Sequence, residues 1–287
     1  MLEPEKNAYY AWPPGHYYSP IPNLNEVIEN KERIFSQADS IPGVHLNDRG
    51  QLRLFDRLSR HYHELPFTPE KTEQYRYYYN NGYYSYGDAI LFFCMIRHLK
   101  PQRIIEIGSG FSSAISLDVN EQFFDSRIRC TFIEPYPDRL LSLIKDDDIA
   151  NITLYKNKLN EVDPKIFGAL SKNDILFVDS THVSKIDSDV NRILFEILPI
   201  LKPGVYIHFH DIFHPFEYPL SWLLEGRFWT EAYLLRAFLQ YNRKFEVQLY
   251  STYFYGKYGK LVSERMPLYE KCRAGHIWIK KKGFIFP

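Results

Sequence analysis

The feature that most constrains the fold is an alternation of short β-rich runs with helix-length stretches along the middle of the chain. The five runs are RIIEI (103–107), RCTFIE (129–134), ITLY (152–155), DILFVD (174–179) and VYIHFH (205–210). Strands that alternate with helices form βαβ units and a parallel sheet. Two later runs, KFEVQLY and HIWIKK, predict a final pair of strands. The sequence therefore predicts an α/β fold with a doubly wound, seven-stranded, mostly parallel sheet.

The N-terminal part of the chain has a different texture. Pro and Tyr interrupt it throughout, and only residues 24–38 and 50–63 show a helical pattern. We predict an aromatic-rich N-terminal extension, or lid, over residues 1–85, which packs on a core domain formed by residues 86–287.

Composition and charge exclude several classes of function. The chain has 287 residues, of which 45% are hydrophobic, so it can bury a full core. Its 35 Lys and Arg residues equal its 35 Asp and Glu residues, whereas a protein that binds a phosphate backbone carries an excess of positive charge. We therefore expect that nucleic acid is not a partner.

Nothing in the sequence indicates a membrane segment or an export signal. No stretch approaches the roughly 20 consecutive apolar residues that a membrane span needs, and the N-terminus lacks the apolar centre of a signal peptide. The cysteines, Cys94, Cys130 and Cys272, are widely separated and lack a metal-ligand spacing. We expect a cytoplasmic protein without a membrane partner, whose thiols are buried and reduced.

Polar residues follow the predicted strands at the edge where such a sheet binds ligands. In doubly wound sheets, ligands lie outside the carboxyl ends of the strands, near the point where the strand order reverses. This rule selects five groups of residues, namely 106–110, Glu134, 156–159, 179–182 and 210–211. We expect the cofactor and the reacting groups among them.

The first predicted strand ends in EIGSG, where Gly108 and Gly110 allow a tight turn and a close approach to a ligand. Ser113 stands where a dinucleotide-binding loop has its third glycine. Glu106 places a carboxylate beside the loop, which would repel a diphosphate and attract a cation. Glu134 ends the second strand, where an acidic residue accepts hydrogen bonds from a ribose diol. A ribose and a positive charge without phosphates indicate S-adenosylmethionine.

Four motifs, EIGSG, IEP, FVDSTH and LKPGVYIHFHD, occur in order on the expected elements. With them, residues 86–282 resemble the class I S-adenosylmethionine-dependent methyltransferases. The N-terminal stretch with GHYYSPIP is similar to a bacterial subgroup of small-molecule or glycan type. The resemblance implies a Rossmann-like methyltransferase fold and an enzyme that uses this cofactor.

The resemblance also implies roles for individual residues. It places the methionine end of the cofactor at Glu106, Gly108, Ser109 and Gly110, the ribose at Glu134, and the adenine near Lys158 and Leu159, with Asp179 as a further contact. Tyr84 and Tyr86 would flank the methionine end, although aromatic packing explains them equally well. Asp88 is expected to cap a helix that ends before Pro101.

In this family the fourth and fifth strands are neighbours, so the resemblance implies that Asp179 and Asp211 face each other. Each lies close to a histidine, His182 or His210. Two carboxylates and two imidazoles near the cofactor's methyl group would suit an oxygen nucleophile, because they can take its proton or hold an ion that lowers its pKa. We predict these four residues as the catalytic group of an O-methyltransferase.

The choice between a metal and a general base stays open. Catechol-type methyltransferases hold magnesium with a third oxygen ligand at the position of Ile212, and a hard ion prefers oxygen. Asp179, His182 and Asp211 form an alternative set that suits manganese, iron or zinc. In the metal-free alternative, an aspartate orients His210 as the general base. The histidines could also simply belong to a core strand.

His208 lies deeper in the fifth strand, and we expect it to be a core residue satisfied by neighbouring backbone. The aromatic stretch after the fifth strand, residues 212–235, is expected to shape the acceptor pocket together with the N-terminal lid at residues 9–22. Packing between lid and core, or a homo-oligomer interface, explains these aromatics equally well.

Two other functions compete with methyl transfer. One is a nicotinamide-dependent oxidoreductase on a Rossmann sheet, against which Glu106 and the missing third glycine count. The other is a non-catalytic scaffold that has kept the fold, because a fold does not guarantee an activity.

Overall fold

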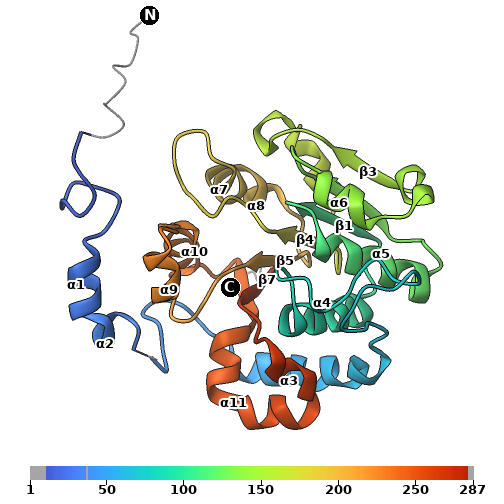
Figure 1. The fold of residues 1–287 in the computed structure, drawn as a ribbon, viewed down its shortest axis with the longest axis horizontal. Coiled ribbons are helices and arrows are strands. Elements are labelled where there is room, and N and C mark those ends of the chain that lie inside the picture. Colours follow the sequence, from blue (N-terminus) through green and yellow to red (C-terminus); the bar gives the residue numbers. More distant parts are fainter. Residues whose placement is uncertain (1–10, 37, 284–287) are drawn as a thin grey trace, which may run out of the picture.

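The computed structural model describes residues 11–36 and 38–283, and it confirms the predicted seven-stranded α/β sheet. The strands are β1 (Arg103–Ile107), β2 (Arg129–Ile133), β3 (Ile152–Tyr155), β4 (Ile175–Val178), β5 (Tyr206–His210), β6 (Phe245–Tyr250) and β7 (His276–Lys281). Their order is β3-β2-β1-β4-β5-β7-β6 (Figure 1). β1 to β5 are parallel, and β7 runs antiparallel to β5 and β6. The order reverses between β1 and β4, so ligands are expected at the carboxyl ends of these two strands.

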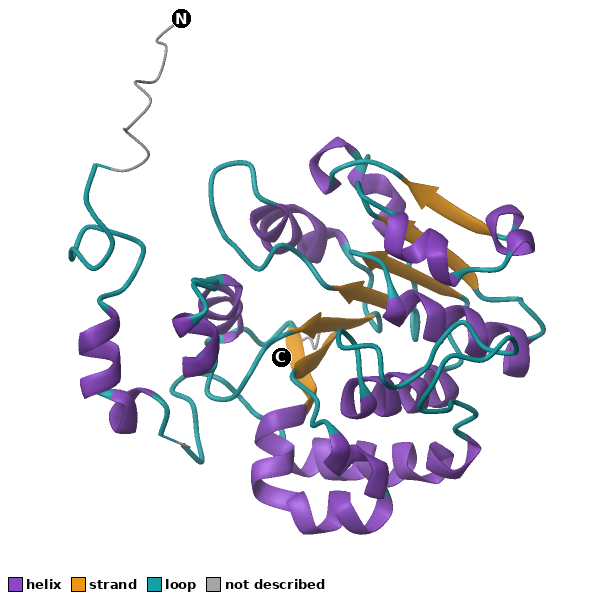
Figure 2. Ribbon diagram, in the orientation of Figure 1, coloured by secondary structure: helices purple, strands orange, loops and turns teal. Residues whose placement is uncertain are grey.

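Helices cover both faces of the sheet (Figure 2). The α-helices are α1 (Leu24–Glu29), α2 (Lys31–Ile34), α3 (Asp48–Leu58), α4 (Tyr86–Leu99), α5 (Phe111–Phe124), α6 (Asp138–Leu143), α7 (Asp189–Arg192), α8 (Leu198–Ile200), α9 (Leu220–Leu224), α10 (Glu231–Leu239) and α11 (Ser251–Arg265). Short 3₁₀ turns are η1 (Ser59–Glu64), η2 (Asp146–Ala150), η3 (Leu159–Glu161), η4 (Pro164–Ala169) and η6 (Pro267–Lys271), and η5 (Ile193–Ile197) is a π-helical turn.

Alternate residues of each strand point to opposite faces, so each strand contributes to two hydrophobic clusters. Phe177 and Trp278 pack in the first cluster with residues of α3, α4, α5 and α11. Val178 and Ile279 pack in the second cluster with residues of η5, α8 and α10. The central strands β4 and β5 are therefore buried along their whole length, whereas the edge strand β3 is only partly covered.

The N-terminal part consists of two segments that behave differently. Phe67, Tyr77 and Tyr79 are buried in the first hydrophobic cluster, and Arg76 forms buried ion pairs with Asp118 of α5 and with Asp148. In contrast, α1 and α2 stand at the side of the molecule and bury none of their residues (Figure 1). The part of the extension that follows α2, from Ile41 through α3 to Tyr84, thus contributes to the core, whereas α1 and α2 do not.

Several predictions of local structure are wrong. The helix expected at residues 24–38 is two short helices that meet at Asn30. Asp88 does not cap α4, because the helix begins at Tyr86 with Ser85 as its N-cap. Cys272 is exposed rather than buried.

Helix α11 was not predicted from the sequence. Its sequence, STYFYGKYGKLVSER, is rich in Tyr and Gly, which are poor helix formers, and the helix is kinked at Tyr258. Burial of Phe254 and Val262 against the first cluster therefore stabilises it more than propensity does. Among the described helices, none has the length and apolar character needed to cross a membrane.

Candidate active site

The turn after β1 brings the ends of β1 and β4 together. Gly108 has a φ of +80°, and a Cβ at this position would lie 2.1 Å from the carbonyl oxygen of Asp179. Only glycine fits both the backbone conformation and the space. Gly110 is the N-cap of α5, and its N–H donates to Ser113 Oγ at 3.1 Å. The two glycines therefore place Asp179 and the N-terminus of α5 at the same edge of the sheet.

Glu106 is a buried carboxylate that is only half satisfied. Its Oε1 accepts a hydrogen bond from Ser112 Oγ, whereas Oε2 has no partner among the described residues. Burial disfavours the charged form and raises the pKa of Glu106 to about 8, although Ser112 and Ser113 act in the opposite direction. An unpaired buried acceptor of this kind is suited to a positively charged donor from a ligand.

Glu134 follows β2 and is held by the backbone on both sides. Its Oε2 accepts from the N–H of Ser109 at 3.2 Å, and its Oε1 accepts from the N–H of Tyr136 at 2.8 Å. Each carboxylate oxygen can accept a further hydrogen bond, so the side chain is oriented without being saturated.

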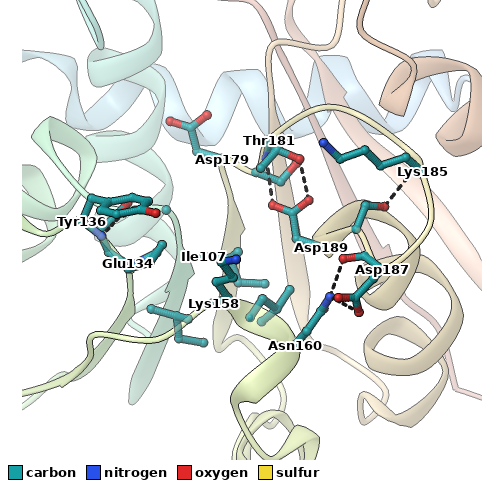
Figure 3. Close-up of a pocket in the computed structure, with 16 residues that line it drawn as sticks. Ile107, Glu134, Tyr136, Lys158, Asn160, Asp179, Thr181, Lys185, Asp187 and Asp189 are labelled. Atoms are coloured by element: carbon teal, nitrogen blue, oxygen red, sulfur yellow. Dashed lines mark hydrogen bonds between the residues drawn. The ribbon is translucent and has the colours of Figure 1, made fainter. Parts of the chain in front are cut away.

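A cavity of about 400 Å³ lies at the carboxyl ends of β1, β2 and β4 (Figure 3). It brings together five residues that the sequence predicted, namely Gly108, Glu134, Lys158, Leu159 and Asp179. Glu106, Ser109 and Gly110, which were predicted to contact the cofactor, are not among the residues that line this cavity. The loop after β4 forms the far wall, where Asp189 accepts hydrogen bonds from Thr181 and Asn160 donates to Asp187 (Figure 3). The motif FVDSTH contained Thr181 of this wall, whereas no motif indicated its residues 185–189.

The four predicted catalytic residues lie together at the ends of β4 and β5. His210 Nδ1 is 3.4 Å from Asp179 Oδ1 and 3.6 Å from Asp211 Oδ1. His182 Nε2 is 3.3 Å from Asp179 Oδ1 and 3.8 Å from Asp211 Oδ2. Both His182 and Asp211 have positive φ values of 60° and 56°. Such strained backbone in non-glycine residues is often found at functional sites.

The electrostatics of this group couple its four members. Burial lowers the pKa of both histidines, but the neighbouring carboxylates outweigh it and raise the pKa of His182 to about 10 and that of His210 well above its ordinary value. Burial raises the pKa of Asp211, whereas the charges of His210 and His182 overcome burial at Asp179 and hold its pKa well below the ordinary range. The protonation state of each member therefore depends on the charges of the other three.

Comparison with known proteins agrees with this geometry. Residues 105–212 match a protein family described as a methyltransferase domain. An uncharacterized protein of Archaeoglobus fulgidus is 38% identical over 174 residues, which cover 57% of this chain and 76% of the relative. The chain belongs to the class I S-adenosylmethionine-dependent methyltransferases. This assignment favours methyl transfer over the nicotinamide-dependent alternative.

Two solved structures are distantly similar to this methyltransferase. One is the S-adenosylhomocysteine-bound methyltransferase PaMTH1 of Podospora anserina, with 14% identity, a TM-score of 0.44 and coverage of 92% of this chain and 99% of that chain. The other is the O-methyltransferase TomG of Streptomyces achromogenes, involved in tomaymycin synthesis and solved with S-adenosylmethionine, with 12% identity, a TM-score of 0.45 and coverage of 91% and 97%.

The metal set that the structure offers differs from the one predicted. Asp179, His210 and Asp211 each present one ligand atom, and these atoms lie within 4.8 Å of one another. His182, the predicted nitrogen ligand, is not part of this set, and its Nδ1 is engaged by Glu231. Ile212 is fully buried and contributes no ligand. A set of two carboxylates and one imidazole suits manganese, iron or zinc better than magnesium.

Two carboxylates that the sequence analysis missed support the histidines of the methyltransferase. Glu231 binds His182 Nδ1 at 2.8 Å. Asp88, predicted as a helix cap, instead accepts from His276 Nδ1 at 2.7 Å, and its other oxygen lies 3.8 Å from His210 Nε2. Both acids begin helices in the sequence, so they carried only the signal of ordinary helix starts.

His208 is a core residue as predicted, but it is not satisfied by backbone. Its ring stacks on Phe177 at 4.1 Å, and neither ring nitrogen has a partner among the described residues. Burial lowers the pKa of His208 well below its ordinary value, which keeps the ring neutral.

The aromatic stretch after β5 forms a cluster beside the catalytic group. Trp229 packs on His182 with ring centroids 4.3 Å apart and on Trp222 at 5.2 Å, and Tyr218 lies 5.7 Å from Trp229. A cavity of about 690 Å³ lies between residues 31–36 and 213–220. Of the predicted lid, residues 9 and 10 lie outside the described part of the chain, and residues 14, 15, 21 and 22 border a hollow that also contains Phe228.

Proposed function

We propose that this methyltransferase transfers a methyl group from S-adenosylmethionine to a hydroxyl oxygen of a small molecule or a glycan. The observation that carries the proposal is that Asp179 belongs both to the cavity and to the catalytic group. A cofactor bound in the cavity would therefore present its reactive end to residues that can take a proton from a hydroxyl.

The residues around the cavity fit the charge pattern of this cofactor. Oε2 of Glu106, which no described residue contacts by a hydrogen bond, is suited to the cofactor's amino group. The remaining acceptor sites of Glu134 are suited to the two hydroxyls of the ribose. Gly108 and Ser109 would contact the methionine end from the turn after β1. Lys158 and Leu159 line the cavity where the adenine is expected.

When bound, S-adenosylmethionine supplies a methyl group on a positively charged sulfur, so the donor needs no further activation. The protein has to position the acceptor and remove its proton. His210 takes this proton, and the carboxylates of Asp179 and Asp211, at 3.4 and 3.6 Å, stabilise the imidazolium that forms. Because the pKa of His210 is raised, turnover should increase with pH beyond the ordinary histidine range.

A metal-assisted version of the same reaction has one observation in its favour, the ligand set of Asp179, His210 and Asp211. In that version these residues would hold a divalent cation, which lowers the pKa of the acceptor hydroxyl. His210 would then be a ligand and not the base. Metal dependence of activity decides between the two versions.

The cofactor assignment is tested by calorimetric titration with S-adenosylhomocysteine, with EDTA and again with magnesium or manganese, and with NADH in parallel. We expect micromolar binding of S-adenosylhomocysteine and no binding of NADH. Glu134→Ala should weaken binding by up to roughly 1.5 to 3 kcal/mol for each charge-assisted hydrogen bond that is lost. Glu73→Ala, an exposed glutamate, is the matched control. Binding of NADH alone would overturn the assignment.

The reaction is tested by screening hydroxyl-bearing aromatic and sugar acceptors for release of S-adenosylhomocysteine, with and without EDTA. A product methylated on oxygen would support the proposal, whereas methylation on nitrogen or carbon would refute it. Full turnover in EDTA favours His210 as the base, and turnover restored only by manganese or magnesium favours the metal-assisted version.

A further inference from the structure

Glu231, the first residue of α10, supports the catalytic group from outside the sequence motifs. Its side chain is 1% exposed, and its Oε2 lies 2.8 Å from His182 Nδ1. Its Oε1 accepts a hydrogen bond from Ser180 Oγ at 2.9 Å. An ionised carboxylate can only accept hydrogen bonds, so Nδ1 of His182 must carry a proton. Both partners of Glu231 come from the loop that follows Asp179.

The backbone at the start of α10 holds the same loop. The N–H groups of Thr230 and Glu231 donate to the carbonyl oxygen of His182 at 2.9 and 3.0 Å. Thr230 Oγ1 also accepts from the N–H of Ser184 at 2.8 Å. These contacts hold His182 in its left-handed conformation, and Trp229 packs on the face of its ring. The ring therefore has one orientation, with Nε2 directed at Asp179 and Asp211.

The two histidines of the catalytic group differ in how firmly they are held. His182 has a short hydrogen bond to a buried carboxylate on the side away from the group. His210 has no such bond, because its closest carboxylate oxygens lie at 3.4 to 3.8 Å and its Nδ1 has no hydrogen-bond partner among the described residues. His182 is thus the fixed group and His210 the freer one.

We propose that Glu231 is a positioning residue, which keeps a proton on Nδ1 of His182 and aims Nε2 at the point where the acceptor oxygen would lie. In this arrangement His182 orients the acceptor by a hydrogen bond, while His210 takes the proton. The proposal rests on the proposed function and assigns its two histidines different tasks. Carboxylates behind functional histidines fix the tautomer and the ring orientation in the same way at metal sites.

The test compares Glu231→Ala and Glu231→Gln with the unaltered protein, each prepared with isotope-labelled histidine for NMR. The resonances of His182 are identified as those missing from His182→Asn. In the unaltered protein we expect a protonated Nδ1. In Glu231→Ala the proton should be lost from Nδ1 and kept on Nε2, which faces Asp179. The amide oxygen of Glu231→Gln can still accept from Nδ1, so this variant should restore the original signal.

Gln240→Ala is the matched control, because it removes a contact at the other end of α10, the hydrogen bond to the carbonyl oxygen of Pro42. It should leave the His182 signals unchanged. Should Glu231→Ala fail to fold, Glu231→Asp withdraws the carboxylate from Nδ1 by one methylene and supplies the same comparison. His182 signals that stay the same in these variants would overturn the proposal.

Titration of the same samples with S-adenosylhomocysteine separates this proposal from the proposed function. We expect the affinity of Glu231→Ala to stay within about threefold of the unaltered protein, because Glu231 does not line the cofactor cavity. A much larger loss in Glu231→Ala alone would make Glu231 part of the cofactor site and overturn the positioning role. Absence of binding in the unaltered protein would refute the proposed function, whatever the His182 spectrum shows.

Discussion

The two halves of the site, at the carboxyl ends of the parallel strands, differ in how their charged side chains are paired. The cofactor half, at the ends of β1 and β2, contains the buried carboxyl group of Glu106, one oxygen of which has no hydrogen-bond partner in the described part of the chain. The catalytic half, at the ends of β4 and β5, contains two carboxylates that already face two histidines. One half is incomplete without a ligand, whereas the other is close to electrically balanced before any ligand binds.

This difference suits the two halves to two tasks, ligand binding in one and positioning of the reacting groups in the other. An unpaired buried carboxylate costs stability in the free protein, and that cost is recovered when a cation binds. A balanced group costs less and holds its residues in place, which is what transfer in a fixed geometry requires. The two halves meet at Gly108 and Asp179, where β1 and β4 come into contact.

The largest effect on stability and cofactor binding is expected from a substitution at Gly108, where the two halves meet. Gly108→Ala places a Cβ 2.1 Å from the carbonyl oxygen of Asp179 and forces a side chain into a φ of +80°. Strain and overpacking together should lower the free energy of unfolding by roughly 2 to 6 kcal/mol and abolish cofactor binding. Thermal unfolding and titration with S-adenosylhomocysteine measure both effects.

Gly168→Ala is the control, since a Cβ there meets no atom of residues 11–36 or 38–283 within 4 Å. It should leave the unfolding temperature and the affinity close to those of the unaltered protein. If Gly108→Ala bound the ligand equally well, the close contact between the two halves would not matter for function.

The next largest effect is a loss of turnover, expected from substitutions in the catalytic half alone. His210→Ala and Asp211→Asn should lower turnover by about 100-fold or more, the usual contribution of a general base, while binding of S-adenosylhomocysteine stays nearly intact. His63→Ala, an exposed histidine on η1, is the control. Unchanged turnover in both variants would show that the reaction centre lies elsewhere.

The pH profile adds a second check on Asp211→Asn. A general base must be deprotonated, and its rate limb rises with pH through its pKa. Asp211 is one of the carboxylates that raise the pKa of His210, so its neutralisation should move the limb to lower pH. If the limb did not move, Asp211 would not influence the pKa of the general base.

In the cofactor half, the sequence could show the residues of the turn after β1 together because they are local, and their role in binding the cofactor stays a prediction. Glu106, Gly108 and Gly110 lie within five positions of one another, so a motif could show them together. The fold was also predictable, since strand runs at regular spacing leave few arrangements of a doubly wound sheet. Helix α11 was not predicted, because tertiary packing stabilises a sequence of low helix propensity.

The surroundings of the catalytic half could not be predicted, because they come from distant parts of the chain. Glu231 lies 49 positions from His182, and Asp88 lies 188 positions from His276. In the sequence both acids look like ordinary residues at the start of a helix. Their partners become visible only when α4 and α10 pack beside β7 and β4.

A smaller effect is expected from Glu106→Gln, which changes how the stability of the cofactor half depends on pH. The pKa of Glu106 is raised to about 8, so the folded protein binds a proton that the unfolded chain releases near the ordinary pKa of 4.5. The stability that depends on this group is therefore present below pH 4.5 and is lost as the pH rises to about 8. Glu106→Gln stays neutral and should become more stable than the unaltered protein as the pH increases through this window.

The same variant should bind S-adenosylhomocysteine more weakly, about tenfold or more, because the amide cannot form the charged contact. Thermal unfolding across pH and titration at one pH give the two readings. Glu70→Gln, an exposed glutamate, should change neither. If Glu106→Gln gained stability without losing affinity, Glu106 would be a buried acid that contacts no ligand. The contrast between the two halves would then not hold.

The smallest effect is expected from Asp88→Asn, which tests how far the catalytic half extends. The asparagine oxygen can still accept from His276 Nδ1 and from the N–H of Gly275, so the fold should be kept. The contacts with His276 Nδ1 and, at 3.8 Å, with His210 Nε2 both lose the charge of the carboxylate, but only the second joins Asp88 to the catalytic group. Turnover should therefore fall by less than roughly fivefold, which corresponds to about 1 kcal/mol of activation free energy.

Asp88 is also one of the acids that raise the pKa of His210, so the rate limb of Asp88→Asn should move slightly to lower pH. Asp163→Asn, at the N-cap of η4, is the matched control and should change neither the rate nor the limb. A fall in turnover as large as that of His210→Ala would contradict this grading. Asp88 and His276 would then belong to the reaction centre, and the balanced group would extend from β4 through β5 to β7 and α4.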